Sequence, residues 1–450
     1  MVSEFVSPME HTKYSSDILG KTCVYFYKNY YFFVNYMIFI IEKRLVFNYI
    51  LYMKVILKTY KYRMYPNKEQ EQMLAKYFGS VRFVYNHFLA ERKQQYTENG
   101  KSDNYYAQAS TLTKLKKQEE YLWLKEINSQ TLQFALRNLE TAYTNFFRGN
   151  ARFPRFKAKK NGGSFHIPQH CSVENGRIYI PKFKGGIKIV EHRPFRCGDV
   201  RNMTISVTPS GKYYVSILTQ VAYESLQKTN AKVGIDLGLK DLVITSDGKR
   251  YSSNKFIKHY SKELAKAQKH LSRKQKGSNS WDRQRIKVAR IQEKIHNCRF
   301  DKLHKISTDL IRNYDVICCE DLNVKGMQRN HRLAQSISDA SWGAFLSMLT
   351  YKAVMNDKQV VKIGRYYPSS KTCHHCGWVK EDLSLKDREW ICPSCGEILD
   401  RDVNAAINIL SEGLRNISAG TVDYTDGADV RPFQGQSAMK SEAHKSFICK

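Results

Sequence analysis

The sequence predicts a chain of several domains that combines α/β with α+β structure. It has 450 residues, the length of two to four ordinary domains. Hydrophobic residues make up 42% of the chain and aromatic residues 12%, which excludes a wholly disordered or collagen-like protein. Helix-like and strand-like segments alternate along it, and two Cys-x-x-Cys pairs stand near its end. Together these observations favour folded modules, one of them built around a metal ion.

Positive charge is concentrated in the middle of the chain. The formal net charge is +31, from 73 Lys and Arg against 42 Asp and Glu. Residues 1–52 hold five basic and four acidic groups and residues 411–450 hold five of each, so a net +30 falls on residues 53–410. This excess predicts a polyanionic partner, with nucleic acid as the first candidate. A membrane surface and a merely solvated basic face stay open as alternatives.

The two ends lack the periodic patterns of folded elements. The longest uncharged run near the start, Asn29–Ile41, is shorter than the roughly 18–20 apolar residues of a membrane span. No secretory signal pattern is present in this part. Residues 1–52 are therefore predicted to be a non-native or disordered extension before Met53, with a peripheral membrane anchor as the alternative. Residues 412–450 are predicted to be a flexible tail.

A strand and a helical block are expected next. Residues 53–66 alternate aromatic and basic side chains in the manner of a strand. Asn67 can cap a helix after it, and a second amphipathic helix is predicted over Ser129–Phe147. Residues 67–148 are thus predicted to be mainly helical, with their apolar stripes in a core.

Short strand-like runs separated by Gly and Pro fill residues 149–229. They predict a small barrel or sheet assembled around the helical block. The runs are Arg177–Ile180, Gly186–Val190, Met203–Thr208 and Tyr213–Gln220.

Two segments combine the features of a nucleic-acid contact. Residues 148–160 place six basic side chains among aromatic and proline rings, so that cations can reach phosphates while rings stack on bases. Residues 255–312 hold 17 Lys and Arg against five Asp and Glu and predict a helical hairpin broken at Gly277. A solvated basic loop and an ordinary helix pair are the alternatives. The candidate contacts are Arg148, Arg152, Arg155, Lys157, Lys159, Lys160, Lys266, Arg273 and Lys274.

The clearest motif is a pair of cysteine knuckles. Cys373 and Cys376 form the first, Cys392 and Cys395 the second, and 15 residues separate them. This spacing predicts a four-thiolate zinc ribbon holding one zinc ion, and a closed shell of four ligands makes that zinc structural. A redox Cys-x-x-Cys is disfavoured because it would need only one such pair.

Three acidic positions could carry chemistry. Asp236 interrupts an apolar strand pattern, Glu320 and Asp321 follow another, and Asp400 and Asp402 begin a helix after the ribbon. Taken singly, each could be a turn acid, a strand-end acid or a helix cap. Carboxylates that converge from strand ends and a helix start can hold two divalent cations for phosphodiester hydrolysis. Mg²⁺ suits such all-oxygen ligands.

The residues around these motifs resemble the TnpB (OrfB) proteins of insertion sequences, which are related to type V CRISPR effectors. The match rests on Gly234–Lys240, on Cys318–Met327, and on the four-cysteine ribbon followed by Asp400–Leu410. It extends over about residues 53–410. The resemblance implies that Asp236, Glu320 and Asp402 are the catalytic ligands of two Mg²⁺ ions. Asp321 and Asp400 are the nearest alternatives.

The resemblance also implies an architecture. It predicts an RNase H-like (RuvC) nuclease domain with an inserted zinc ribbon, preceded by a β-barrel wedge domain that a helical recognition block divides. The implied boundaries are 53–66 and 149–229 for the wedge, 67–148 for the recognition block, 230–370 and 398–411 for the nuclease domain, and 371–397 for the ribbon.

The activity implied by the resemblance is RNA-guided cleavage of double-stranded DNA. The guide RNA would come from the transposon end, and the protein would act as a monomer with its RNA in the cytoplasm of a prokaryote, at the nucleoid. Two alternatives stay open: a DNA-strand-transfer transposase, and a zinc-containing regulator that binds nucleic acid without cutting it.

Overall fold

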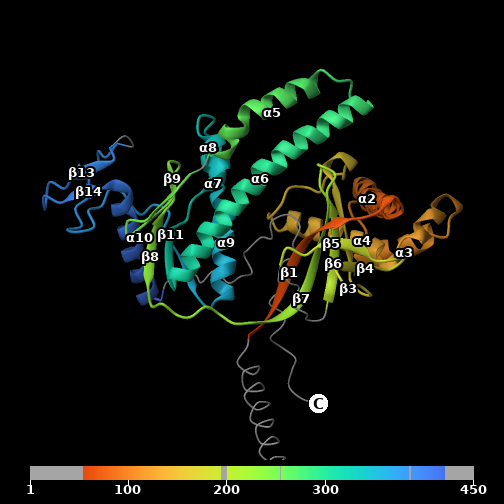
Figure 1. Cartoon of the computed structure of the whole chain (residues 1–450), viewed down its shortest axis with the longest axis horizontal. Helices are drawn as coiled ribbons and strands as arrows, with labels where there is room; N and C mark the ends of the chain where they lie inside the picture. The colour runs from red at the N-terminus through yellow and green to blue at the C-terminus, as the bar shows by residue number, and fades with distance from the viewer. Residues whose placement is uncertain (1–53, 194–199, 254, 385–386, 421–450) are drawn as a thin grey trace, which may run out of the picture. The chain divides into compact units, whose positions relative to one another are not determined.

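The computed structural model describes residues 54–193, 200–253, 255–384 and 387–420 (Figure 1). The predicted extension 1–52 and most of the predicted tail lie outside the described residues. The described residues within 56–221 and 225–420 belong to one compact unit, and this unit holds every predicted site residue. None of the helices in the described ranges is long and apolar enough to cross a bilayer.

A seven-stranded sheet contains the first strand and all the short strands that follow the helical block. Its order is β2-β6-β7-β1-β5-β4-β3, which leaves β2 and β3 at opposite edges. In the described residues the sheet is therefore open. The residue pattern allowed a small barrel or a sheet, whereas the resemblance implied a β-barrel. Helices of residues 67–148 share the core of this sheet and cover its apolar face. The strands are β1 (Lys54–Tyr65), β2 (Gly163–Ile167), β3 (Ser172–Glu174), β4 (Arg177–Tyr179), β5 (Ile187–Val190), β6 (Val200–Val207) and β7 (Tyr213–Tyr223).

The predicted helical block is confirmed and shares one core with this sheet. It consists of α2 (Lys68–Asn99), α3 (Tyr105–Leu115), the 3₁₀ turn η1 (Glu119–Glu126) and α4 (Ser129–Phe147). Asn67 caps α2 in a reciprocal pair of hydrogen bonds with Gln70. Buried residues of β1 and β2, such as Tyr62 and Phe165, pack in the same cluster as the helix stripes. A second 3₁₀ turn, η2 (Lys159–Asn161), leads into β2.

A five-stranded sheet begins where the first carboxylate was expected. Its order is β10-β9-β8-β11-β12. β8, β11 and β12 run parallel to one another. β9 is antiparallel to β8, and β10 is antiparallel to β9. The parallel strands come from distant parts of the sequence, so long connections join them. The strands are β8 (Lys232–Asp236), β9 (Asp241–Thr245), β10 (Arg250–Ser252), β11 (Val316–Glu320) and β12 (Gln359–Ile363).

Helices cover both faces of this sheet, which explains its continuous apolar strands. Along β11, Ile317 and Cys319 face a core shared with α6 (Asn279–Asn313) and α9 (Trp342–Met355). Cys318 faces the opposite way, toward α10 (Arg401–Ser418). Figure 1 shows α9 and α10 on opposite sides of the strands. Two short helices, α7 (Val324–Met327) and α8 (Ala334–Ala340), precede α9.

The predicted basic hairpin is confirmed as two helices. α5 (Phe256–Ser272) ends before Gly277, whose φ of 90° requires the left-handed conformation that glycine tolerates. Ser278 then caps α6 by accepting the backbone N–H of Trp281. The two helices pack against each other. The turn that the sequence predicted at Gly277 is therefore found between the two helices.

The ribbon segment forms the two-stranded sheet of β13 (Glu389–Ile391) and β14 (Ile398–Asp400), and α10 follows at once. α10 continues to Ser418, beyond the boundary at 411 that the sequence suggested. The helix extends because Ile417 still packs against the core beneath Cys318. The first part of the predicted tail is therefore helical.

Candidate functional site

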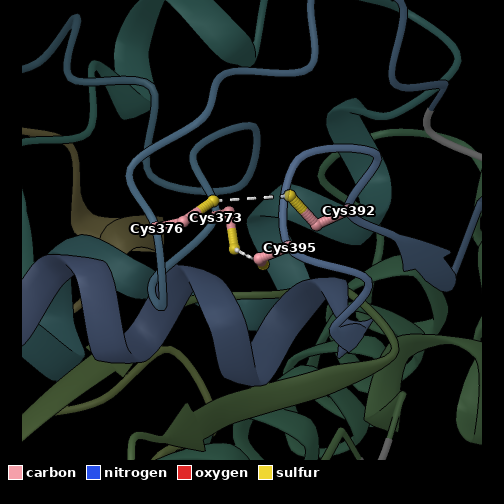
Figure 2. Close-up of side chains that lie close together, drawn as sticks. All are labelled: Cys373, Cys376, Cys392 and Cys395. Atoms are coloured by element: carbon pink, nitrogen blue, oxygen red, sulfur yellow. Dashed lines mark hydrogen bonds between the residues drawn. The ribbon is translucent and has the colours of Figure 1, made fainter.

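The four cysteines of the two knuckles lie around one point. Their sulfur atoms are all within 4.8 Å of one another. Cys373 Sγ lies 3.7 Å from Cys395 Sγ, and Cys376 Sγ lies 3.5 Å from Cys392 Sγ, so each knuckle faces the other (Figure 2). Four thiols at these distances fit the tetrahedral shell of a zinc ion. The cysteine cluster predicted from the spacing is thus confirmed as a site that could bind zinc.

The backbone around the thiols suits metal binding. Gly377 and Gly396, which follow the knuckles, have φ values of 80° and 75°, a region that side chains avoid. Hydrogen bonds, the largest of them from the backbone N–H of Trp378, lower the pKa of the Cys376 thiol to about 6, which favours the metal-binding thiolate at this position. Burial raises the pKa of Cys373, and the pKa of Cys395 is also raised in spite of a backbone hydrogen bond from Glu397, so this preference belongs to Cys376 and not to all four thiols. His374 instead contacts Asn404 of α10 through its ring and its backbone.

Two of the predicted carboxylates end neighbouring parallel strands. Asp236 is the last residue of β8 and Glu320 the last residue of β11. The register pairs Cys319 with Ile235, so one step further along the strands Glu320 lies beside Asp236. Carboxyl ends of adjacent parallel strands are the usual place for ligands in open α/β sheets. Glu320 also accepts a hydrogen bond of 2.6 Å from the Ser369 hydroxyl.

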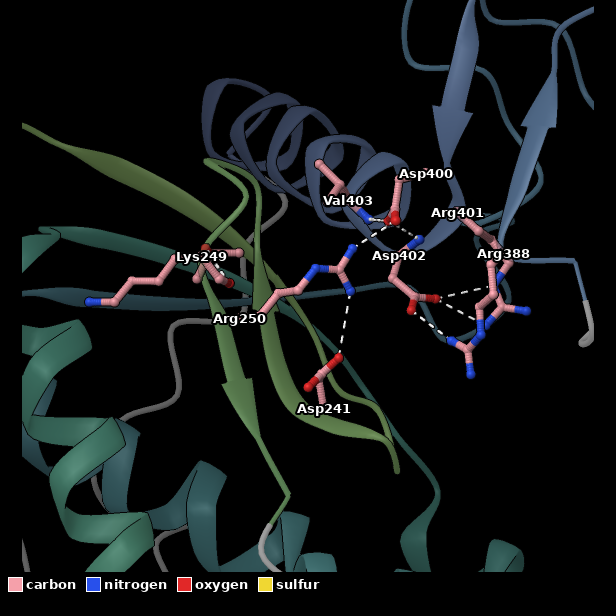
Figure 3. A network of polar contacts seen from close by, with 9 residues as sticks. Asp241, Lys249, Arg250, Arg388, Asp400, Arg401, Asp402 and Val403 are labelled. Carbon is pink, nitrogen blue, oxygen red and sulfur yellow. Dashed lines mark hydrogen bonds and ion pairs between the residues drawn. The ribbon is translucent and has the colours of Figure 1, made fainter.

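The third predicted carboxylate, Asp402, starts α10 and is held by two arginines (Figure 3). Arg388 Nη1 lies 2.9 Å from Asp402 Oδ2, and Arg401 Nη2 lies 3.0 Å from Asp402 Oδ1. Both carboxylate oxygens are therefore engaged by guanidinium groups. A cation bound at Asp402 would compete with these two ion pairs.

The three acids interact electrostatically. Burial, together with the negative charges of Glu320 and Asp402, raises the pKa of the Asp236 carboxyl to about 7. A carboxyl whose ionised form is disfavoured by like charges is stabilised as the anion when a cation arrives. Among the described residues, the four cysteines form the group of ligating side chains that lies close enough together to hold a metal ion, and the three acids are not gathered in this way.

The two alternative acids are engaged elsewhere. Asp321 pairs with Arg365, whose Nη2 lies 2.5 Å from its Oδ2. Asp400 caps α10 by accepting the backbone N–H groups of Asp402 and Val403. Its other oxygen lies 2.7 Å from Arg250 Nη2. These contacts give both acids roles in fixing the fold.

The nine basic residues singled out in the sequence all have exposed side chains, but the ammonium of Lys157 lies 4.0 Å from the centroid of the Tyr85 ring, and burial lowers its pKa. The stretch 148–160 is anchored on α2, because Asn86 exchanges two hydrogen bonds with the backbone of Lys157 at 2.8 and 2.9 Å. Lys93 of α2 lies over the rings of Phe153 and Phe156, 5.3 and 4.7 Å from their centroids. Both rings remain exposed, at 41% and 53%. The stretch therefore presents cations and rings together.

Sequence reasoning missed three side chains at the site. Arg388 and Arg401 hold Asp402, and Ser369 holds Glu320. Arg401 lies between Asp400 and Asp402 in the sequence, so its closeness to these acids could have been predicted. Ser369 and Arg388 come from loops whose folding no local pattern predicts.

Three family models match parts of the chain. Residues 342–409 match the model described as "Cas12f1-like, TNB domain", and residues 212–331 match "Probable transposase". Residues 53–101 match "Helix-turn-helix domain". In the structure, this last range forms β1 and the single long helix α2.

Curated relatives match most of the chain. A Streptomyces pristinaespiralis protein named "Putative RNA-guided DNA endonuclease" is 38% identical over 402 residues, covering 88% of this chain and 98% of that protein. "Putative RNA-guided DNA endonuclease InsQ" of Escherichia coli K12 is 35% identical over 382 residues, covering 81% and 94%. "TnpB-like protein L770" of Acanthamoeba polyphaga mimivirus is 25% identical over 405 residues, covering 80% and 74%.

A solved structure, titled "Cryo-EM structure of the Cas12f1-sgRNA-target DNA complex", covers 79% of this chain and 98% of its own. Its TM-score is 0.48 at 13% sequence identity.

Proposed function

The chain belongs to the TnpB (OrfB) family, and from this premise we propose that it is an RNA-guided DNA endonuclease. It would cut phosphodiester bonds with Asp236, Glu320 and Asp402 in a RuvC-type, RNase H-like domain formed by the five-stranded sheet and α10. Support comes from the relatives that bear this description and share most of their length with the chain.

One observation carries the catalytic part of the proposal. Asp236 and Glu320 end adjacent parallel strands, and the charge of Asp402 reaches Asp236 from the first turn of α10. Burial and then the charges of two acids from separate segments, Glu320 and Asp402, raise the pKa of the Asp236 carboxyl. A fold gains no stability from such repulsion, so the arrangement favours a cationic ligand.

The donor set fits Mg²⁺ in kind, because all its ligands are carboxylate oxygens. Two bound Mg²⁺ ions would activate a water and stabilise the leaving oxygen of the DNA strand. Asp236 and Glu320 would hold the ions from the strand ends. Asp402 would join them after exchanging its ion pairs with Arg388 and Arg401 for a metal bond.

The cysteine cluster would hold one structural zinc. Its four thiols leave no open position for water or substrate, so the ion would support the fold and take no part in chemistry. The knuckle backbone contacts α10 through Asn404, close to Asp402. Zinc would therefore stabilise the segment that presents the third acid.

The exposed cations would hold nucleic-acid backbones. Residues 148–160 and the hairpin 255–312 combine high positive charge with surface exposure, as phosphate contacts require. Base pairing with the guide would read the target sequence, which explains why the proposal needs no sequence-reading helix. The seven-stranded sheet would serve as the wedge, residues 67–148 as the recognition block, and the complex would be one protein chain with one RNA.

The first experiment tests the RNA. The protein is purified from cells that carry its native locus, and the co-purifying RNA is sequenced. A discrete RNA from the transposon end is expected, and replacing its guide segment should redirect cleavage to a matching plasmid in Mg²⁺. Cleavage that ignores the guide sequence would refute the proposal.

The second experiment tests the acids. Asp236→Ala should abolish cleavage and leave RNA and DNA binding unchanged. Asp301→Ala is the matched control, because its exposed carboxylate on α6 pairs only with Lys305 among the contacts described. Wild-type cutting by the Asp236 variant would contradict the assignment.

A strand-transfer transposase is the second candidate, and the description "Probable transposase" for residues 212–331 favours it. The products separate the two functions. A guided endonuclease leaves broken DNA, whereas a transposase joins the transposon end to the target.

A further inference from the structure

A short strap of chain links the zinc knuckle to the carboxylates. Residues 369–374 form the last part of the connection from β12 to the first knuckle, include the first two residues of that knuckle, and lie along α10. Ser369, at the start of the strap, contacts Glu320; His374, at its end, lies between two of the thiols in sequence.

Two buried asparagines of α10 hold this strap. Asn404 and Asn408 are one helical turn apart and are exposed by only 1% and 5%. The Asn408 amide donates to the carbonyl of Ser369 at 2.8 Å and to that of Thr372 at 2.6 Å. The Asn404 amide donates to Thr372 at 2.7 Å and accepts the backbone N–H of His374 at 2.9 Å. Both side chains thus bond the strap backbone, and Asn404 Oδ1 also lies 3.0 Å from the ring nitrogen Nδ1 of His374.

The strap in turn orients Glu320. Ser369 is 5% exposed, and its hydroxyl donates to Glu320 Oε1 at 2.6 Å. A short hydrogen bond to an ionised acceptor is strong and directional. It fixes one carboxylate oxygen and leaves the other, with the remaining lone pair of Oε1, available to a cation. Contacts behind metal ligands commonly set their orientation and affinity.

We propose that Ser369 is a positioning residue for Glu320, and that Asn404 and Asn408 couple this contact to the first zinc knuckle. The inference rests on the proposed function, since it assigns Glu320 to a divalent cation. Asn404 lies two residues after Asp402 in the first turn of α10, so the same polar connection reaches the segments that carry two of the three acids.

The test measures binding of Mn²⁺, used in place of Mg²⁺, to zinc-loaded, nucleic-acid-free full-length protein by electron paramagnetic resonance. Binding that disappears in Asp236→Ala defines the carboxylate site. Ser369→Ala should raise the dissociation constant at this site about tenfold. Ser369→Thr should restore it, because the hydroxyl is kept, and Asn408→Ala should weaken binding in the same direction as Ser369→Ala.

Thr372→Val is the matched control. It removes a hydroxyl from the same strap, but that hydroxyl bonds the carbonyl of Pro368 and not a carboxylate. Its Mn²⁺ affinity, like the zinc content of every variant, should equal that of the wild type. If Ser369→Ala binds Mn²⁺ as tightly as the wild type, this inference alone is overturned. The same follows if Thr372→Val loses as much Mn²⁺ affinity as Ser369→Ala does. Absence of Asp236-dependent Mn²⁺ binding in the wild type overturns the proposed function and this inference together.

Discussion

The side chain of Asp400 accepts a hydrogen bond of 3.1 Å from the backbone N–H of Asp402. Two acids two residues apart therefore differ in role. Asp400 closes the start of α10 and pairs with Arg250, while the Asp402 carboxylate points toward Arg388 and Arg401 (Figure 3). The proposed chemistry assigns Asp402 to catalysis and Asp400 to stability, and mutations can separate the two.

Asp400→Ala removes the helix cap. It should lower the free energy of unfolding by about 1 kcal/mol, measured by urea denaturation, because two backbone N–H groups lose their acceptor. Asp400→Asn should keep most of this stability, since asparagine also caps helices. Asp402→Asn should show the opposite pattern, with cleavage lost and the free energy of unfolding nearly unchanged. Equal loss of cleavage in Asp400→Asn and Asp402→Asn would contradict the division.

The stability of the protein should depend on pH through Asp236. Its pKa is about 7 in the folded chain, above the ordinary 3.8, so the folded state binds more protons between these values. Stability contributed by this group is present below about pH 4 and is lost as the pH rises through 7.

Asp236→Asn should therefore raise the free energy of unfolding at pH 8 by about 2–4 kcal/mol in buffer free of Mg²⁺, and by almost nothing at pH 4. Urea denaturation at the two pH values measures both differences. Asp301→Asn, at an exposed ion pair, is the control and should shift neither. If the Asp236→Asn variant has a lower free energy of unfolding than the wild type at pH 8, the ionised Asp236 carboxylate does not destabilise the folded protein.

Loss of one thiol should release the metal from the ribbon. Cys392 is fully buried within the cluster, and Cys392→Ser should reduce the zinc content from about one ion per chain to near zero. Limited proteolysis should then cut within residues 371–400. Cys298→Ser, which changes a half-buried cysteine of α6 outside the cluster, should keep the zinc. Retention of zinc by Cys392→Ser would exclude a four-thiolate site.

Close packing of α10 on the sheet depends on glycine. A Cβ atom on Gly234 would lie 2.0 Å from the carbonyl oxygen of Ala406, too close for any real contact. Gly234→Ala should therefore push α10 away from β8, lower the free energy of unfolding by about 3 kcal/mol and abolish cleavage. Gly343→Ala is the control, because no atom lies within 4 Å of the added carbon. It should be neutral or stabilise α9 by up to about 1 kcal/mol.

Short sequence patterns, such as apolar stripes, turn glycines and ligand spacing, correctly predicted the helices, the turns and the cysteine cluster that they mark. The helix over Ser129–Phe147 is found with the bounds that its apolar stripe predicted, and in the structure Asn128 caps its start. The break at Gly277 and the cysteine cluster followed from backbone requirements and ligand spacing in the same way. The position of Glu320 beside Asp236 agrees with the expected convergence of strand-end acids.

Features that depend on long-range packing were not predicted. β2 was missed because it begins with Gly163 and Ser164 and buries only Phe165 and Ile167. The strand patterns left a barrel and a sheet as alternatives, because they do not show how the helices pack on the strands; the described strands form an open sheet that shares its core with the helices. The contact of Ser369 with Glu320 joins residues 49 positions apart and has no local signature.

The order of the strands also sets when the carboxylate site can exist. Asp236, Glu320 and Asp402 are spaced more than 80 residues apart along the chain, and α10, which packs on β8, is the last helix in the described ranges. At a ribosomal rate of about 5–20 residues per second, roughly 8–33 seconds separate the synthesis of the first acid from that of the third. A nascent chain would therefore hold its basic surfaces before it holds a complete set of acids. Synthesis itself would delay the capacity to cut until the last helix has docked.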